Sequence, residues 1–264
     1  MANKALVTIA VGEPYKSWWC EVARPTWEEY AARHGYEVIA FHEPLDRSQR
    51  GLDRSFSWQK CLIPELPEIK RFDRIVCLDC DIAIQPEIAP DIAAATPEDK
   101  IGGVTNFSPP ALPPGIFPET YYTDWGLPTN FDTVVNCGML VLTPRLHSWL
   151  FARTYWEYEE RGGPEWHYEQ RPLSHGIQTN GLLHTLDRRF NRTLTSDIHH
   201  CFPFLPHIPE EGNELVFRMC IQTIYCRNYF IHFAGYHRLM RFLDPSIRRF
   251  DEFGRICTAV DGHQ

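Results

Sequence analysis

The stretch Arg74-Ile-Val-Cys-Leu-Asp79-Cys-Asp81-Ile82 decides the fold, because it is a short apolar run that ends on two carboxylates. Such a run is typical of a buried strand, and two charges at its end are costly to desolvate without a counterion. Open α/β sheets bind ligands just beyond the carboxyl ends of their strands. The stretch therefore predicts a hard cation, Mn²⁺ or Mg²⁺, on Asp79 and Asp81. The other interpretation is a turn in which both Asp side chains only accept hydrogen bonds.

The preceding segments show the alternation of strand and helix that is typical of an α/β protein. Residues 5–11 (ALVTIAV) and 36–41 (YEVIAF) are strand-like, and residues 15–34 between them carry apolar side chains at helical spacing. A helical stretch at 57–69 then leads to the strand at Arg74. Such β-α-β units predict a parallel sheet. We expect a single-domain α/β fold with a mainly parallel, Rossmann-like sheet flanked by helices.

The second half of the chain is more irregular. Five prolines in residues 108–118 (SPPALPPGIFP) exclude regular structure and indicate a binding loop or lid. We then expect a strand at 134–142, helices at 146–158 and 175–186, short strands and turns at 188–236, and a short helix or irregular tail from 243. Within one domain spanning 1–264, we assign a nucleotide-binding half to 1–105, a donor-sugar and acceptor half to 106–242, and a tail to 243–264.

Composition limits the classes of partner. The 264 residues carry a net charge of -8, with 34 acidic against 26 basic residues, which argues against nucleic acid because phosphate contacts need clustered Lys and Arg. The apolar run at 5–11 is too short for a membrane span, so we expect at most a peripheral membrane contact. The nine cysteines are scattered, and several sit in strand-like runs as small hydrophobes. They predict a reducing, cytoplasmic compartment. The sequence predicts nothing about the oligomeric state.

Six ordered segments carry a more specific signal. They are 57–60 (SWQK), 72–81 (FDRIVCLDCD), 136–141 (NCGMLV), 169–174 (EQRPLS), 189–191 (RFN) and 232–238 (HFAGYHR). Together they resemble the nucleotide-sugar glycosyltransferases of the GT-A fold, and most closely family eight, the group of glycogenin and the bacterial lipooligosaccharide galactosyltransferases. The resemblance implies a metal-dependent enzyme that moves a hexose from a nucleotide-diphosphate sugar, a UDP-hexose, to a hydroxyl group of a glycan, glycolipid or small acceptor. It also implies retention of configuration.

The resemblance also implies a metal and diphosphate site. Asp79, Asp81 and His232 would bind Mn²⁺ or Mg²⁺, and diphosphate oxygens would complete the coordination shell. Gly235 would allow the backbone to approach a phosphate closely. Arg238 stands where the family has Lys, so it would neutralise the diphosphate through a planar fork instead of a point charge. The other interpretation of His232 is a buried histidine whose hydrogen bonds are made within the core.

The donor sugar and the reaction centre are assigned in the same way. Asn136 and Gly138 belong to the strand beside the donor sugar, and Lys60 is a second cation for the donor. Glu169 and Gln170 are the candidates for the reaction centre. Because Glu169 has the chemistry of a general base, the sequence leaves retention and inversion open. Two alternatives remain open: Asn136 has only a structural role, and Lys60 is a solvated residue on a helix.

The first strand departs from the family pattern, which tends to place Asp or Asn after it to hold the uridine. Here the backbone groups of Thr8, Ala10 and Gly12 would line the base, so membership of a neighbouring family stays open. Residues 121–125 (YYTDW) either stack against an acceptor sugar or pack their own loop. Residues 178–180 (QTN) are a weaker alternative for the reaction centre.

Other interpretations carry less support. Adjacent histidines at 199 and 200 point opposite ways if they lie on a strand, which argues against a second metal site. A sugar-nucleotide nucleotidyltransferase is also an α/β enzyme that needs Mg²⁺, but it typically has a Gly-rich basic loop after the first strand, and residues 11–14 (VGEP) are not one. A non-catalytic nucleotide- or carbohydrate-binding protein on the same fold is the other alternative, and the predicted metal cluster counts against it.

Overall fold

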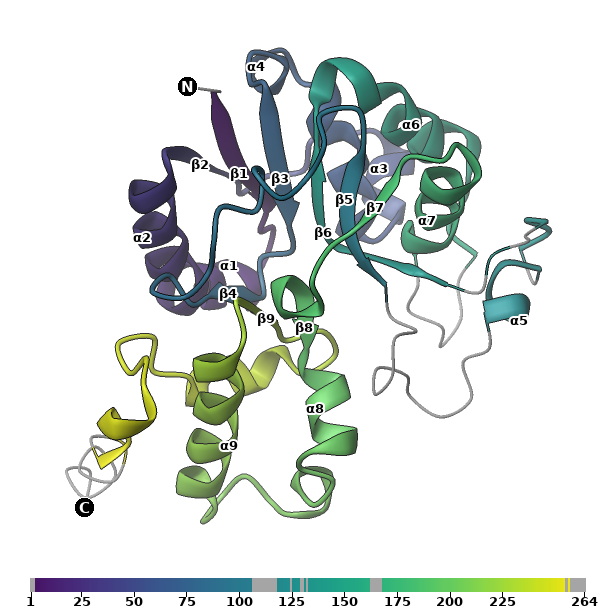
Figure 1. Ribbon diagram of the computed structural model, residues 1–264. Coiled ribbons are helices and arrows are strands. Elements are labelled where there is room, and N and C mark those ends of the chain that lie inside the picture. The colour runs from purple at the N-terminus through teal and green to yellow at the C-terminus, as the bar shows by residue number, and fades with distance from the viewer. Residues whose placement is uncertain are drawn as a thin grey trace.

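The computed structural model describes residues 3–105, 118–123, 125–128, 131, 133–161, 168–254 and 256 (Figure 1). A large sheet has the order β2-β1-β3-β6-β5-β7, and a small sheet has the order β4-β9-β8. The strands of the large sheet are β2 (Tyr36–Phe41), β1 (Lys4–Ile9), β3 (Arg74–Leu78), β6 (Val135–Leu142), β5 (Ile101–Thr105) and β7 (Leu183–Thr185). Those of the small sheet are β4 (Ile82–Ile84), β9 (Phe230–His232) and β8 (Arg192–Thr193).

Strand direction in the large sheet is mixed in one place only. β1 pairs in parallel with β2 and β3, and β5 pairs in parallel with β7. β6 runs antiparallel between β3 and β5. The predicted mainly parallel α/β sheet is therefore confirmed.

Each face of the large sheet is covered by its own apolar layer. Leu6 and Val76 pack on the side of α2 (Arg24–His34) and α9 (Glu214–Arg227). Ala5, Val7, Ile75 and Cys77 point the other way, toward α6 (Pro144–Glu157) and α7 (Gln170–Thr179). Since successive strand residues alternate between faces, burial on both faces makes these strands continuous apolar runs.

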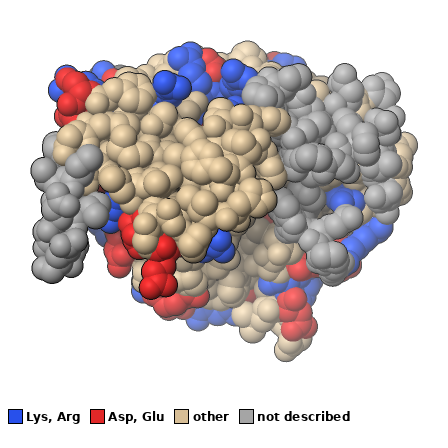
Figure 2. Space-filling model, turned by 90° about the horizontal axis from the view of Figure 1, so that it is seen from below, with Lys and Arg blue, Asp and Glu red and all other residues tan. Residues whose placement is uncertain are grey.

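The remaining helical segments are short. They are α1 (Tyr15–Trp18), α3 (Gln49–Asp53), α4 (Pro67–Lys70), α5 (Pro118–Thr123) and α8 (Leu194–His200), with a π-helical turn η1 (Trp19–Ala23) and the 3₁₀ segments η2 (Phe56–Glu65), η3 (Arg188–Asn191), η4 (Leu205–His207), η5 (His237–Phe242) and η6 (Phe250–Glu252). Within the described ranges, every helix is too short or too polar to cross a bilayer. Viewed from below, the molecule has a broad uncharged area with acidic and basic side chains around it (Figure 2).

Two expectations for the second half were wrong. The helix expected at 175–186 is α7, which begins at Gln170 and ends at Thr179, because Gly181 adopts a φ of 62° and the chain then enters β7. The region expected to hold only short strands and turns contains α8 and α9. In α9 the buried residues Phe217, Cys220, Ile221, Ile224 and Tyr225 recur at helical spacing. Residues 106–117, which hold most of the proline-rich loop, lie outside the described ranges.

Candidate active site

The turn between β3 and β4 joins the two sheets and carries Asp79 and Asp81. The Asp79 N–H donates to the carbonyl oxygen of Gly138 at 2.8 Å, and the Phe233 N–H donates to that of Asp81 at 3.1 Å. The register of β4 with β9 pairs Ile82 with His232. Strand pairing therefore brings His232 beside the two carboxylates.

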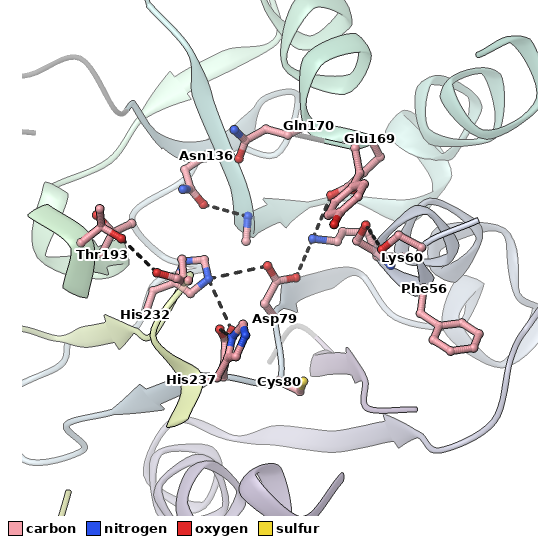
Figure 3. A pocket seen from close by; sticks show the side chains of 18 of the residues that line it. Phe56, Lys60, Asp79, Cys80, Asn136, Glu169, Gln170, Thr193, His232 and His237 are labelled. Carbon is pink, nitrogen blue, oxygen red and sulfur yellow. Dashed lines mark hydrogen bonds and ion pairs between the residues drawn. The ribbon is translucent and has the colours of Figure 1, made fainter. Parts of the chain in front are cut away.

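Asp79, Asp81 and His232 form a compact set of possible metal ligands. One ligand atom from each residue lies within 4.8 Å of the others. The Nε2 atom of His232 is 3.4 Å from Oδ1 of Asp81 and 3.7 Å from Oδ2 of Asp79 (Figure 3). Two carboxylates and one imidazole are a ligand set that suits Mn²⁺ and can also bind Mg²⁺. The side chains therefore fit the metal that the sequence predicts.

Charge pairing shifts the pKa values of Asp81 and His232 in opposite directions. Burial raises the pKa of Asp81, but His232 and His237 outweigh burial and hold that pKa well below its ordinary value. Burial lowers the pKa of His232, and the charges of Asp81 and Asp79 reverse the effect and raise it. The carboxylate of Asp81 is thus held in the ionised form that binds a cation.

A hydrogen-bonded chain holds the imidazole of His232 from behind. Its Nδ1 lies 2.9 Å from Oδ1 of Asn191, and Nδ2 of Asn191 donates to Oδ1 of Asn136 at 2.9 Å. The same Asn136 oxygen accepts the N–H of Gly138 at 2.9 Å. Asn136 therefore has a structural role, and its contact with a donor sugar stays a prediction.

Lys60 is buried between two carboxylates instead of being solvated on a helix. Its Nζ lies 2.5 Å from Oδ1 of Asp79, 2.9 Å from Oε1 of Glu169 and 3.4 Å from the carbonyl oxygen of Cys137. Burial lowers the pKa of Lys60, but both carboxylates outweigh burial and raise it well above its ordinary value. The ammonium group thus connects the predicted metal site to the predicted reaction centre, and its contact with a donor stays a prediction.

Glu169 and Gln170 lie at the start of α7, where both side chains are held in place. Glu169 is buried and paired with Lys60. Gln170 accepts the N–H of Cys137 at Oε1 and donates from Nε2 to the Tyr121 hydroxyl, both at 3.0 Å. Their catalytic roles stay predictions.

These side chains share one cavity of about 830 Å³. Its wall includes most of the residues that the sequence singled out, drawn from segments far apart in the chain. They are Lys60, Asp79, Asp81, Asn136, Gly138, Glu169, Gln170, His232 and Gly235.

Four predicted residues are not in the cavity wall. Thr8 and Ala10 are 1% and 0% exposed, Gly12 is exposed, and the wall is formed instead by Ile9 and Val11. Thr8 and Ile9 are successive residues of β1, and successive strand residues face opposite sides. The expected contact of the base with the backbone groups of Thr8, Ala10 and Gly12 stays a prediction.

Arg238 is the fourth residue outside the wall. Its Nε donates to Oε1 of Glu210 at 2.6 Å, and its side chain is 69% exposed. Arg238 is therefore not placed at the cavity, which its neighbour His237 lines. The expected contact of Arg238 with the diphosphate stays a prediction.

Sequence reasoning missed several wall residues. His237 was overlooked although it directly precedes Arg238, and its Nδ1 lies 3.4 Å from Oδ2 of Asp81. His199 was set aside on the assumption of a strand, but it lies on α8 and lines the cavity. The wall also includes Tyr15 and Tyr168.

The structure distinguishes some of the alternative roles of residues 121–125 and 178–180. Tyr122 is fully buried and packs its own region, whereas Tyr121 lines the cavity and binds Gln170. Asp124 lies outside the described residues. Gln178 donates to the Tyr122 hydroxyl and is not among the cavity residues, so the alternative reaction centre at 178–180 is not supported.

Comparison with known proteins identifies the fold. No protein-family model matches the sequence, and no curated protein matches it. A solved glycosyltransferase involved in glycosylation of the major capsid of PBCV-1 matches with a TM-score of 0.55 and 12% identity, over 90% of this chain and 100% of that one. The bifunctional glycosyltransferase WbbM matches with a TM-score of 0.57 and 12% identity, over 97% of this chain and 51% of that one. The chain has the GT-A glycosyltransferase fold.

The GT-A fold gives the cavity its place in the architecture. Its wall includes residues from the carboxyl ends of β1 and β3, which are adjacent in the sheet, and β2 lies on the other side of β1. Ligands of open α/β sheets bind at such a point, where the strand order reverses. The fold by itself does not determine chemistry, and assignment to family eight stays a prediction.

Proposed function

We propose that the chain is a metal-dependent glycosyltransferase that moves a hexose from a nucleotide-diphosphate sugar to a hydroxyl acceptor. The observation that carries the proposal is the cluster of Asp79, Asp81 and His232 in the cavity wall at the point where strand order reverses in a GT-A sheet. When bound there, Mn²⁺ or Mg²⁺ supplies positive charge to the diphosphate of the donor.

The charges of the wall support metal dependence. Lys60 is the only Lys or Arg among the described residues of the wall, and Asp79 and Glu169 already pair with it. Asp79, Asp81 and Glu169 would repel a diphosphate unless a cation is added. A bound divalent ion therefore matches the charge that the site lacks.

The partners of the carboxylates support retention. An inverting transfer needs a carboxylate that is free to take the acceptor proton. In the described part of the wall, Glu169 is paired with Lys60, and Asp79 and Asp81 belong to the metal cluster. None of the three is available as that base. We propose a retaining reaction, in which Gln170, held by Cys137 and Tyr121, helps to orient the donor sugar.

The donor, acceptor and compartment are proposed on narrower grounds. The ordered segments resemble enzymes that use UDP-sugars, so we propose a UDP-hexose donor and a glycan, glycolipid or small hydroxyl acceptor. Ile9 and Val11 offer apolar contact for the base. All described cysteines are free, which supports a reducing compartment, and we propose the cytoplasm.

Calorimetric titration with a panel of nucleoside diphosphates, with and without Mn²⁺, tests the proposal. We expect one diphosphate, UDP, to bind only with the metal, and Asp81→Asn to abolish that binding while Asp99→Asn, at an exposed site, retains it. Incubation with the matching sugar nucleotides then has to release the nucleoside diphosphate in the presence of acceptor. Metal-independent binding, or no binding by any diphosphate, would contradict the metal assignment. Tight binding without turnover of any donor would favour a binding protein.

A further inference from the structure

His237 lies beside the metal cluster and is held on three sides. Figure 3 shows His237 near His232 and Asp79. Its Nδ1 is 3.4 Å from Oδ2 of Asp81. Its ring stacks on that of Trp18 at 5.5 Å and 28° and meets the edge of Tyr15 at 5.3 Å. His237 begins η5, and about a third of its side chain is exposed, at the cavity wall. The imidazole is therefore ordered but open to a ligand.

The next residue, Arg238, is anchored elsewhere. Its guanidinium binds one oxygen of Glu210 at 2.6 Å, and Arg241 binds the other oxygen of the same carboxylate. Neither arginine belongs to the cavity wall. Reaching the cavity would require Arg238 to break its ion pair.

His237 lies next to the cluster of Asp79, Asp81 and His232 but is not part of it. Oδ1 of Asp81 faces His232 and Oδ2 faces His237, each at 3.4 Å. The three residues whose ligand atoms come within 4.8 Å of one another do not include His237. A metal held by Asp81 would leave the second imidazole free to contact a diphosphate bound in the same cavity.

The backbone before His237 is also open to such a ligand. Gly235 has a φ of 74°, and among the described residues only its chain neighbours can lie within 4 Å of the place that a Cβ would occupy. A phosphate can therefore approach the chain closely two residues before the imidazole. An imidazole N–H is a strong hydrogen-bond donor to phosphate oxygens.

We propose that His237, and not Arg238, is the side chain that hydrogen-bonds the diphosphate of the donor. The inference rests on the proposed function, since it needs a diphosphate in the cavity. The family resemblance assigned the contact with the diphosphate to Arg238, and the inference assigns it to His237. Trp18 and Tyr15 then act as positioning residues that hold the imidazole.

The experiment measures the affinity of UDP and UMP in saturating Mn²⁺ for the wild-type chain and four variants. For His237→Ala we expect the UDP affinity to fall by about tenfold or more, because a charge-assisted hydrogen bond is lost. The affinity for UMP, which lacks the second phosphate, should fall by less than about threefold. His237→Gln keeps a donor and should recover part of the loss. Arg238→Ala, and His207→Ala as a control for removal of an exposed imidazole, should change UDP affinity less than about twofold.

Two further measurements separate the possible outcomes. The first is the Mn²⁺ affinity without nucleotide, followed by electron paramagnetic resonance. If the imidazole is not a metal ligand, the affinity of His237→Ala should stay within about threefold of the wild-type value. The second is thermal unfolding, which establishes that the variant folds. UDP affinity that falls in Arg238→Ala but not in the His237 variants would overturn the inference while leaving the proposed function intact. Failure of the wild-type chain to bind any nucleoside diphosphate would remove both.

Discussion

A Cβ atom on Gly138 would lie 2.2 Å from Cε1 of His232, so the imidazole occupies space that a larger residue at 138 would fill. The nearest other atoms are Nδ1 of the same ring at 2.9 Å and Oδ1 of Asn136 at 3.0 Å. His232 is buried and bonded to Asn191, which prevents an easy shift of the ring. Gly138 is therefore required for the position of the metal cluster.

We predict that Gly138→Ala weakens Mn²⁺ binding by at least about tenfold and destabilises the fold by about 1–3 kcal/mol, the usual cost of overpacking. Calorimetry and chemical denaturation measure the two effects. Gly254→Ala is the matched control, because no described residue, its chain neighbours aside, lies within 4 Å of its added Cβ. Mn²⁺ binding of wild-type strength in Gly138→Ala would show that the ring can move aside.

The hydrogen-bonded chain behind His232 fixes which ring nitrogen carries the proton. The Gly138 N–H can only donate, so the Asn136 atom that accepts it is the oxygen. Asn191 then donates its amide to that oxygen and turns its own oxygen to Nδ1 of His232. The Nδ1 atom is therefore protonated, and Nε2 faces the carboxylates.

We predict that Asn191→Ala lowers Mn²⁺ affinity by about 10–100-fold, as for other residues that orient a metal-ligating histidine. The variant keeps Asp79, Asp81 and His232 in the chain, so the loss isolates orientation from ligand number. Asn180→Ala, at the exposed end of α7, is the control and should change affinity less than about twofold. Equal affinities in the two variants would mean that the ring is held by packing alone.

Lys60→Met should be strongly destabilising. Removal of the ammonium leaves Glu169 as a buried, unpaired charge and removes a partner of Asp79, at a cost of about 3–5 kcal/mol. Lys70→Met removes an exposed pair with Glu65 and should cost about 0–1 kcal/mol. Urea denaturation of both variants at pH 7 measures the difference.

The pH dependence of this effect follows from the direction of the pKa shift. Because the pKa of Lys60 is raised on folding, its stabilising contribution is fully present below the ordinary lysine pKa and is lost as pH rises through the raised value. The stability gap between wild type and Lys60→Met should thus hold from pH 7 to 9 and narrow only at strongly alkaline pH. A gap that closes by pH 9 would contradict the ion pairs.

Metal removal should abolish nucleotide stabilisation. At a UDP concentration of about 100 times its dissociation constant, we expect about 2.7 kcal/mol of stabilisation in Mn²⁺. Chelation with EDTA should remove it, and excess Mn²⁺ should restore it, because Asp79, Asp81 and Glu169 otherwise repel the diphosphate. Thermal unfolding detects both changes. Stabilisation that survives EDTA would mean that nucleotide binding needs no metal.

Local sequence patterns predicted the parts of the structure that local forces determine. The bounds of β2 and β3 match the apolar runs: β3 is buried along its whole length, which leaves a clear signal, and β2 is a partly buried strand rich in β-branched and aromatic residues. The proximity of Asp81 and His232 depends on pairing of β4 with β9, which only the family resemblance suggested. The cavity wall includes Ile9 and His237 but not Thr8 and Arg238, because of strand alternation and of an ion pair with Glu210, which local patterns do not reveal.

The pairing of β4 with β9 has a consequence for cooperativity. Asp79 directly follows β3 of the large sheet, whereas Asp81 directly precedes β4 and His232 ends β9 of the small sheet. An ion bound by all three would tie together two units that could otherwise open separately. We therefore expect amide hydrogen exchange in β4 and β9 to slow on addition of Mn²⁺, while exchange in β2, at the far edge of the large sheet, keeps its rate.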